Sequence, residues 1–310
     1  MDDLAVTADS PVGQHVTKLN AQFSVEVTPR EVDRVGPFER LLPPGTAVYI
    51  TYLDTTGLEG TIAAARTLTA AGMRPIPHLA ARAVHSHREL DDAVGRLTQQ
   101  AGVDDVLVVA GSFTRHGVHP STMDLLRSGV LQAHGITAVG VAGHPEGAPN
   151  IDPDALAQAV LDKNTFARDS GMAVRLVTQF AFAPEPLIAW ERALREAGNQ
   201  LPVHVGLPGA VSASTLLRDG LRCGVGPSLK VLRTQAGRLS RLASTVPQYP
   251  DHTVTGIARA AAVDPQSLFT AFHYFPFGGL ELTGRWATEL GAGAFAHSRD
   301  GRLLTASRPH

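Results

Sequence analysis

The sequence predicts a (β/α)8 barrel, an α/β fold, on two observations: eight short apolar runs recur at a steady interval, and helix-like segments separate them. The runs occupy residues 22–27, 47–53, 74–80, 104–111, 136–143, 174–182, 202–209 and 270–277. Strand and helix in alternation indicate parallel strands joined by right-handed crossovers. Eight such units match the (β/α)8 TIM barrel.

The connecting segments have the character of helices. Residues 60–72 and 87–102 carry apolar side chains near helical spacing, and each ends in a glycine where a helix C-cap belongs. The seventh connection, residues 210–269, is the longest and is expected to hold two or three helices with a loop at 246–252. The barrel is therefore assigned to 21–295, with an N-terminal tail over 1–20 and a C-terminal tail over 296–310, each helix-forming or mobile.

A doubly wound open sheet is the main structural alternative. That fold often places G-x-G-x-x-G directly after its first strand. TPREVDR and DTTGLEG follow the first two runs here, and neither matches the motif. The segment GVGPSL, residues 224–229, has only two of the three glycines and follows a helix-like segment. The motif evidence therefore favours the barrel.

Composition narrows the class of protein. The chain has 27 Lys and Arg residues against 29 Asp and Glu residues and no basic stretch, which argues against a nucleic-acid partner. Its one cysteine, Cys223, excludes an intramolecular disulfide and suits a reducing compartment. No apolar run approaches the roughly 20 residues that span a bilayer. We expect a cytoplasmic protein without membrane contact, and a homo-oligomer is compatible with the sequence.

Polar residues stand at or just past the ends of six predicted strands, where a barrel carries its active site. They are Glu26, Thr51, His78, Ser112, His144 and Gln179. Strand alternation places Ser24 and Glu26 on the face opposite Val25 and Val27, so Glu26 is expected to point into the barrel mouth. Desolvation there would raise its pKa toward the range of a general acid. The competing interpretation pairs Glu26 with an arginine, such as Arg30 or Arg82.

Six motifs in order resemble the methylenetetrahydrofolate reductase family, a family of flavin-dependent (β/α)8 barrels. They are FSVEVTP, ITYLDTTG, PHLAAR, VVAGSF, VGVAGHPEGAP and LVTQFAF, and the resemblance covers roughly residues 20–210. It implies that Glu26 is the general acid that helps open the methylene bridge of the substrate to an iminium. It also implies that Gln179 holds the pterin ring and places Ser112 beside the substrate. Phe180 and Phe182 are a pair that could flank the substrate ring, and core packing is an equally good interpretation of them. An amide suits a pterin edge because it donates and accepts hydrogen bonds at once.

The resemblance also implies a cofactor site for FAD, with NADH or NADPH as the nicotinamide. Residues that match flavin-lining positions are Thr51, His78, Gly111, Ser112 and His144, and Lys163 and Arg168 are basic candidates for a cofactor phosphate. The family's arginine-glycine-aspartate after strand 4 reads Ala110-Gly111-Ser112 here, so its two charged residues are absent. No metal site is expected, because no cluster has zinc-like spacing.

The function that the resemblance implies is an oxidoreductase that interconverts 5,10-methylene- and 5-methyltetrahydrofolate by hydride transfer through a flavin. Two alternatives stay open at this point. One is a folate-dependent one-carbon or methyl transferase on the same barrel, without redox chemistry. The other is a non-catalytic homologue that binds folate or flavin.

Overall fold

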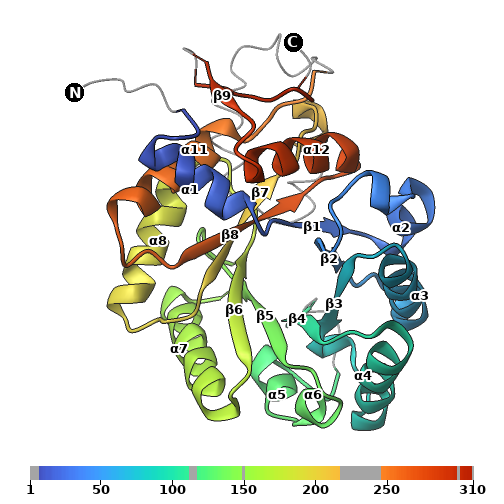
Figure 1. Cartoon of the computed structure of the whole chain (residues 1–310). Coiled ribbons are helices and arrows are strands. Elements are labelled where there is room, and N and C mark those ends of the chain that lie inside the picture. Colours follow the sequence, from blue (N-terminus) through green and yellow to red (C-terminus); the bar gives the residue numbers. More distant parts are fainter. Residues whose placement is uncertain (1–6, 112–116, 149–150, 217–245, 299–300, 309–310) are drawn as a thin grey trace.

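Eight parallel strands close into a barrel in the order of the chain, as the sequence predicts (Figure 1). The computed structural model describes residues 7–111, 117–148, 151–216, 246–298 and 301–308. The strands are β1 (Ser24–Val27), β2 (Ala47–Ile50), β3 (Arg74–Ala80), β4 (Asp105–Val109), β5 (Ala138–Gly143), β6 (Ala173–Thr178), β7 (Val203–Pro208) and β8 (Phe269–Phe275). All eight predicted runs contain a strand. β2 and β6 end three to four residues earlier than predicted, at Ile50 and Thr178, because their last apolar residues belong to loops at the barrel mouth.

Helices surround the barrel and begin where the sequence offers a cap. They are α1 (Pro11–Asn20), α2 (Pro29–Val35), α3 (Gly57–Ala70), α4 (His87–Ala101), α5 (Thr122–Leu126), α6 (Val130–Ala133), α7 (Pro153–Ser170), α8 (Pro184–Glu196), α11 (Asp251–Val263) and α12 (Leu280–Gly291). Short 3₁₀ turns lie at Phe38–Arg40 and Ala81–Ala83. The side chains of Thr28, Ser86 and Asp152 accept hydrogen bonds from the first turns of α2, α4 and α7, which satisfies amides that a helix start leaves unpaired.

Two apolar layers form the core, one on each side of the strands. The larger layer lies between strands and helices and includes Val25 and Val27. The smaller layer fills the barrel lumen with Ala47, Tyr49, Ile76, Leu107 and Val177. Because successive strand residues alternate between these layers, the predicted inward direction of Glu26 is confirmed.

Beside the inner apolar layer, the lumen holds a network of charges. The Arg175 guanidinium donates to the Tyr49 hydroxyl at 2.7 and 2.9 Å and to the Asp105 carboxylate at 3.0 Å. Asp105 also accepts from Arg74, at 2.7 Å. Gly140 makes room for this packing, since a Cβ there would lie 2.8 Å from Leu107. Paired charges therefore fill the interior of the barrel together with apolar side chains.

The two predicted tails contain ordered elements. Helix α1 packs against α11, α12 and β8, and the Tyr274 hydroxyl donates to Asn20 Oδ1 at 2.7 Å. At the other end, β9 (Ala296–His297) and β10 (Leu303–Leu304) form a two-stranded antiparallel sheet. Asp251 at the start of α11 binds this end through Arg308 and the Leu303 amide. The described elements nearest the two termini, α1 and the β9–β10 sheet, thus lie beside α11 and α12 (Figure 1).

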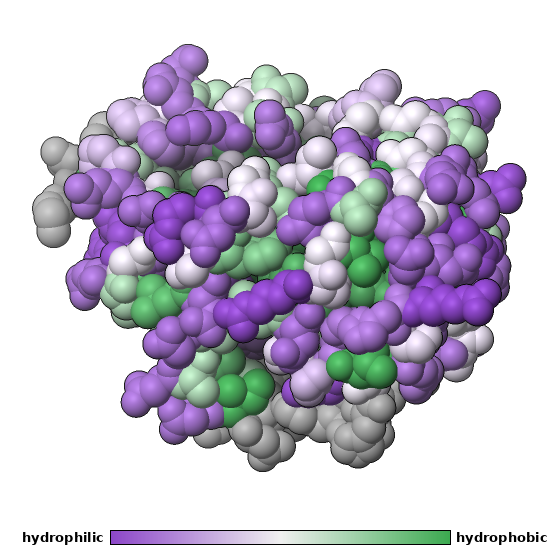
Figure 2. Space-filling view, turned by 90° about the horizontal axis from the view of Figure 1, so that it is seen from below, coloured by the Kyte–Doolittle hydropathy of each residue, from purple (hydrophilic) through white to green (hydrophobic). Residues whose placement is uncertain are grey.

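The face formed by α4 to α7 is mixed in polarity (Figure 2). Figure 2 shows this face, on which apolar side chains emerge in separate patches between polar ones. Among the described residues, every helix is too short or too polar to span a membrane.

The part of the seventh connection at 217–245, with Cys223, lies outside the described residues. Its C-terminal part runs through 246–250 into α11.

Candidate active site

Glu26 is the centre of a polar cluster at the mouth of the barrel. Strand β1 ends one residue later, because Thr28 and Pro29 start α2 with a capping box between Thr28 and Glu31. The Thr51 hydroxyl donates to Glu26 Oε1 at 2.8 Å. His78 Nε2 lies 3.5 Å from Glu26 Oε2. Glu26, Thr51 and His78 were all singled out in the sequence, and they come from β1, the end of β2 and β3. The last two therefore meet at the Glu26 carboxylate.

A fourth member of the cluster, His273, is missing from the sequence-based set. Its Nε2 also lies 3.5 Å from Glu26 Oε2, and its Nδ1 lies 2.8 Å from the Ser24 hydroxyl. The side chain is 0% exposed, in the lumen between β8 and β1. The available signal was a histidine inside an apolar strand, the same signal that singled out Glu26. Neither Arg30 nor Arg82 pairs with Glu26, so the interpretation as a simple Glu–Arg pair is wrong; Arg82 instead bonds the carbonyls of Gly111 and Pro120.

The electrostatics of Glu26 differ from the prediction. Burial raises the pKa of the Glu26 carboxyl, but His78, His273 and Thr51 together lower it more, so the net pKa lies below its ordinary value. Burial lowers the pKa of His78, and Glu26 opposes that effect only in part. The expected upward shift for Glu26 is therefore wrong, since desolvation is outweighed by groups that stabilise the ionised form. At neutral pH the ligand-free cluster holds an ionised carboxylate beside a neutral His78.

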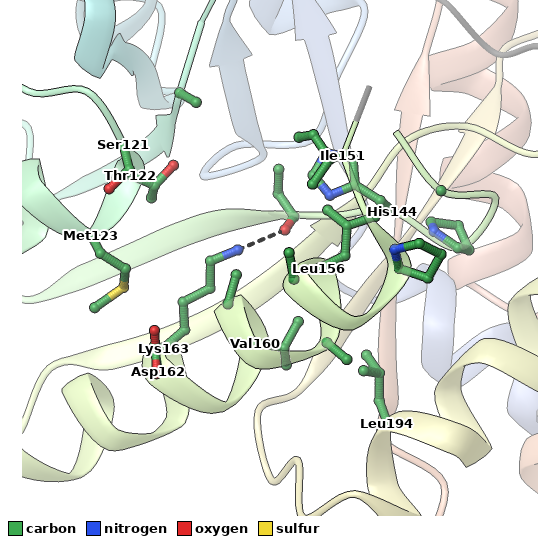
Figure 3. Close-up of a pocket in the computed structure, with 18 of the residues that line it drawn as sticks. Ser121, Thr122, Met123, His144, Ile151, Leu156, Val160, Asp162, Lys163 and Leu194 are labelled. Carbon is green, nitrogen blue, oxygen red and sulfur yellow. Dashed lines mark hydrogen bonds between the residues drawn. The ribbon is translucent and has the colours of Figure 1, made fainter. Parts of the chain in front are cut away.

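A cavity of about 760 Å³ adjoins the ends of β4 and β5 and follows α7 toward α5 and α8 (Figure 3). Ala110, His144 and Lys163 line it, opposite Ser121 and Thr122. Figure 3 shows Lys163 reaching from α7 toward β5, where its ammonium donates to the Ala142 carbonyl at 3.1 Å. His144 and Lys163, which the sequence placed together as candidates, thus share one cavity.

The environment of the cavity disfavours the charged forms of both Lys163 and His144. Burial lowers the pKa of Lys163 to about 8. Burial, and then the charge of Lys163, lower the pKa of His144 to about 4. Within the described residues no carboxylate lies near enough to form a salt bridge with the Lys163 ammonium. A buried amine without a counter-ion is a favourable place for the negative group of a ligand.

The remaining predicted residues are spread around the mouth. Gln179 directly follows β6 and is exposed, and its backbone N–H donates to the Gly143 carbonyl. Phe180 is buried in an aromatic group, with ring centroids 5.2 to 5.7 Å from Phe182, Phe275 and Phe277. Phe275 in turn contacts the ring of His273, at 4.7 Å. This aromatic group therefore continues the Glu26 cluster toward the end of β6.

Three predicted cofactor residues have different outcomes. Gly111 follows β4 with φ of +84°, a backbone conformation that favours glycine, and lies against Ala80. Ser112 lies outside the described residues. Arg168 is in the last turn of α7, largely exposed and paired with Asp169, and does not line the cavity. Of the two basic candidates on α7, the structure brings only Lys163 to the cavity.

Comparison with known proteins supports the architecture. No protein-family model matches the chain. A solved structure from Clostridium thermocellum, described as an uncharacterized protein that binds two copies of 5-methyl-5,6,7,8-tetrahydrofolic acid, is similar in fold. Its TM-score is 0.59 and its identity 12%, over 90% of this chain and 96% of that one. The chain has a TIM-barrel fold.

Two further solved structures are more distant. One is a family 18 chitinase from Crocus vernus, with TM-score 0.43 and 9% identity over 87% of this chain and 98% of that one. The other is the carboxyl transferase domain of Rhizobium etli pyruvate carboxylase, solved with pyruvate and biocytin. Its TM-score is 0.45 and its identity 12%, over 94% of this chain and 51% of that one.

The residues of the cavity suit part of a dinucleotide cofactor. A phosphate needs a cation or amide donors, and Lys163 supplies an amine that lacks a carboxylate partner in the described chain. The apolar lining from α7 and α8, including Leu156, Val160 and Leu194, suits a flat ring. Ala110 adds no charge beside it. For metals, the described residues contain no group of three or more His, Cys, Asp or Glu side chains able to hold an ion.

Proposed function

We propose that this protein is an oxidoreductase that interconverts 5,10-methylenetetrahydrofolate and 5-methyltetrahydrofolate by hydride transfer, with FAD as cofactor and a nicotinamide as partner. The observation that carries the proposal is the cluster around Glu26. A carboxylate with a hydroxyl on one oxygen and two imidazoles beside the other lies at the mouth of a barrel. Such a cluster can hold and move a proton beside a bound substrate.

Glu26 is the catalytic acid in this proposal. Its side chain is 17% exposed, so a ligand in the mouth can reach it. The substrate nitrogen of the methylene bridge takes a proton as the bridge opens, and Glu26 delivers that proton. Thr51 fixes the carboxylate through Oε1, which leaves Oε2 on the side of the imidazoles. The proton is thus handled at a defined atom.

Gln179 and the aromatic group hold the substrate ring. Gln179 offers an amide that both donates and accepts, as the edge of a pterin requires. Phe275 and Phe277 form a partly exposed apolar wall next to His273, and the buried ring of Phe180 packs on both of them. Flat rings pack well on such a wall, at roughly 0.5–1.5 kcal/mol per aromatic pair beyond the area buried.

The cavity beside α7 is the proposed cofactor site. Lys163 would face a phosphate and His144 would line the flavin end, whereas Thr51, His78 and Gly111 do not line this cavity. A bound flavin would supply the group that exchanges a hydride with the folate and the nicotinamide. The chain's own part is to hold these groups together and to exclude water.

The fold likeness to the Clostridium thermocellum protein supports a reduced folate as ligand, because that protein binds 5-methyltetrahydrofolate on a similar barrel.

A second candidate function follows from Ala110, which leaves the cavity without the charged partner expected there. A folate-dependent one-carbon transferase, or a folate-binding protein without catalysis, needs no flavin. The spectrum of the purified protein separates the two: flavin absorption supports the first function, and a colourless protein the second.

Replacement of Glu26 by glutamine tests the catalytic role. Gln keeps the shape and the contact with Thr51 but cannot deliver a proton. Folate turnover should fall by about 10²–10⁴-fold, while reduction of bound flavin by a nicotinamide should largely survive. The measurement is steady-state turnover beside stopped-flow flavin reduction. Near-normal turnover in a folded Glu26→Gln protein would exclude Glu26 as the acid.

Replacement of Gln179 by alanine tests the substrate site. A pterin edge left unpaired in a desolvated site loses about 1–3 kcal/mol. The dissociation constant for 5-methyltetrahydrofolate, measured by calorimetry, should therefore rise by about 5- to 150-fold. Flavin affinity should change little. An unchanged folate affinity would remove Gln179 from the pterin site.

A further inference from the structure

We propose that Lys163 is a nucleophilic lysine, whose amine forms an imine with aromatic and other apolar aldehydes that enter the cavity beside α7. This site goes beyond the proposed function and does not depend on it. A cofactor phosphate at Lys163 would cover the amine, so the imine belongs to the protein without cofactor. The position of the amine, the charges around it and the walls of the cavity together suit this chemistry.

The amine of Lys163 is enclosed and yet reachable. Lys163 is 6% exposed and belongs to the buried side of α7. Its Nζ lies 3.1 Å from the Ala142 carbonyl of β5 (Figure 3). The same cavity of about 760 Å³ is also lined by the exposed residues Asp124 and Gly147, so a small molecule can enter it from solvent. The amine is therefore on the wall of an open space and not in the closed core.

The charges around Lys163 do not hold it in its charged form. The other titratable groups that line the cavity are Arg82, Asp124, Arg127, His144, Glu146 and Asp162. Asp124 accepts from Ser121, and Asp162 accepts from Gln158. In the described part of the chain, none of the carboxylates forms an ion pair with Lys163. Its burial is thus not offset by an opposite charge.

A substantial fraction of this amine is neutral at physiological pH. Burial lowers the pKa of Lys163 from 10.5 to about 8. About one molecule in ten then has a neutral amine at pH 7, against about one in 3,000 for an amine at 10.5. A neutral, desolvated lysine in an apolar pocket is the form that attacks carbonyl carbons.

The walls of the cavity suit an apolar body. Leu156, Val160 and Leu194 line it from α7 and α8. The indole of Trp190 adds a flat surface beside Gly143, where a Cβ would lie 2.9 Å from the ring. An aromatic or aliphatic group packs on such walls and keeps out the water that would hydrolyse an imine. The cavity therefore favours aldehydes with an apolar body.

The step is a condensation that needs no oxidant or reductant. The lone pair of Nζ forms a C–N bond to the carbonyl carbon as the π bond of the carbonyl breaks. The two hydrogens of the neutral amine leave with the carbonyl oxygen as water, and a C=N bond replaces the C=O bond. His144 is neutral at pH 7, because its pKa is about 4, so it adds no positive charge to the cavity during the step.

Reductive trapping tests the site in the ligand-free protein. The chain has three lysines, Lys18, Lys163 and Lys230. The protein is treated at pH 7 with benzaldehyde and sodium cyanoborohydride, which converts imines to stable secondary amines, and mass mapping of peptides follows each lysine and the N-terminal amine. Lys163 should be modified about 10-fold faster, or more, than Lys18, which is exposed on α1. Modification of Lys163 at or below the rate of Lys18 would overturn the proposal.

Two controls show whether the fold causes the preference. Lys163→Met should lose only the adduct at 163, and the matched variant Lys18→Met should keep that adduct. In urea the preference for Lys163 over Lys18 should vanish, because both amines are then in water. A preference that persists in the unfolded chain would come from the local sequence and would refute the role of the cavity. The urea control needs only wild-type protein, so it decides even if Lys163→Met fails to fold.

A second aldehyde tests the class of ligand. Glyceraldehyde is polar and of similar size, and it is used under the same conditions. The ratio of the Lys163 rate to the Lys18 rate should be several-fold higher for benzaldehyde, because only benzaldehyde gains from the apolar walls. The ratio cancels the difference in intrinsic reactivity between the two aldehydes. Equal ratios, or a higher ratio for glyceraldehyde, would overturn the assignment of an apolar ligand.

Discussion

At the scale of single residues, Lys163 opposes folding. Its amine is buried with one carbonyl as partner in the described chain, and its pKa falls from 10.5 to about 8. The native state therefore binds fewer protons than the unfolded state between these values. The contribution of Lys163 to the free energy of unfolding should therefore rise as the pH increases from 8 to 10.5. Below pH 8 the amine is charged in both states, and its burial lowers the free energy of unfolding by a constant amount.

Replacement of Lys163 by methionine should stabilise the ligand-free protein. A drop from 10.5 to about 8 corresponds to about 3 kcal/mol, so we expect a gain of about 1–3 kcal/mol at pH 7, measured by urea unfolding. Lys18→Met, on the exposed side of α1, is the control and should change little. A Lys163→Met protein less stable than wild type would show that the amine contributes favourable contacts.

The residue scale also shows where prediction from sequence succeeds. The direction of Glu26 follows from the period of a strand, which needs only its own segment. Its ionisation depends on His273, which is 247 positions away. The register between β1 and β8 that brings them together exists only in the closed barrel, so the sequence could predict the carboxylate but not its lowered pKa.

At the scale of elements, α1 belongs to the barrel. Asn20, at the end of α1, is buried and accepts the Tyr274 hydroxyl of β8, while its own amide donates to the Val16 carbonyl. The segment gives a weak helical signal in sequence, because only three larger apolar residues, Val12, Val16 and Leu19, stand at helical spacing in it. Its packing depends on β8 and α11, which are distant in the chain.

Replacement of Tyr274 by phenylalanine tests this attachment. Loss of a buried hydrogen bond that leaves Asn20 Oδ1 unpaired should lower the free energy of unfolding by about 1–3 kcal/mol, with ligand binding unchanged. Tyr249→Phe is the matched control, because the buried Tyr249 hydroxyl has no partner among the described residues. Thermal unfolding of both variants measures the difference. Equal stability of the two variants would show that the Asn20–Tyr274 bond contributes nothing.

Helix α7 shows the limit of prediction for elements. Its existence follows from the cap at Asp152 and the C-terminal Gly171 in left-handed conformation. Its buried side is Val160, Lys163 and Phe166. A lysine at such a position is expected in solvent from sequence alone. The cavity beside it, and the separation of Lys163 from Arg168, therefore emerge only from the packing of α7 against β6 and α5.

At the scale of the whole molecule, partly buried histidines make stability depend on pH. Burial, and then Arg175, His273 and Arg74, lower the pKa of His204 to about 3. His144 titrates at about 4. Both are neutral in the native state and become charged in the unfolded chain below its ordinary value of 6.5. The unfolded state then binds more protons, so stability falls as the pH falls from 6.5 toward 4.

We expect the free energy of unfolding to decline by a few kcal/mol over that range, because these histidines take up protons only in the unfolded chain. His204→Gln should flatten the decline, and His252→Gln, with a largely exposed ring on α11, should not. Urea unfolding at several pH values measures both slopes. An identical pH dependence in His204→Gln and wild type would show that His204 is charged in the native state.

The closing of the ring at β8 and β1 has a consequence for how activity arises during folding. Ser24 and His273 are separated by 249 positions, and their strands share only two register pairs. Contacts between residues so far apart in the chain cost the most loop-closure entropy, so they form late. A chain that has made all its helices and seven strands would still lack His273 beside Glu26. Under the proposed function, the Glu26 cluster therefore reports completed folding: an intermediate open at the last strand would be compact but without turnover, and recovery of turnover during refolding would lag behind recovery of secondary structure.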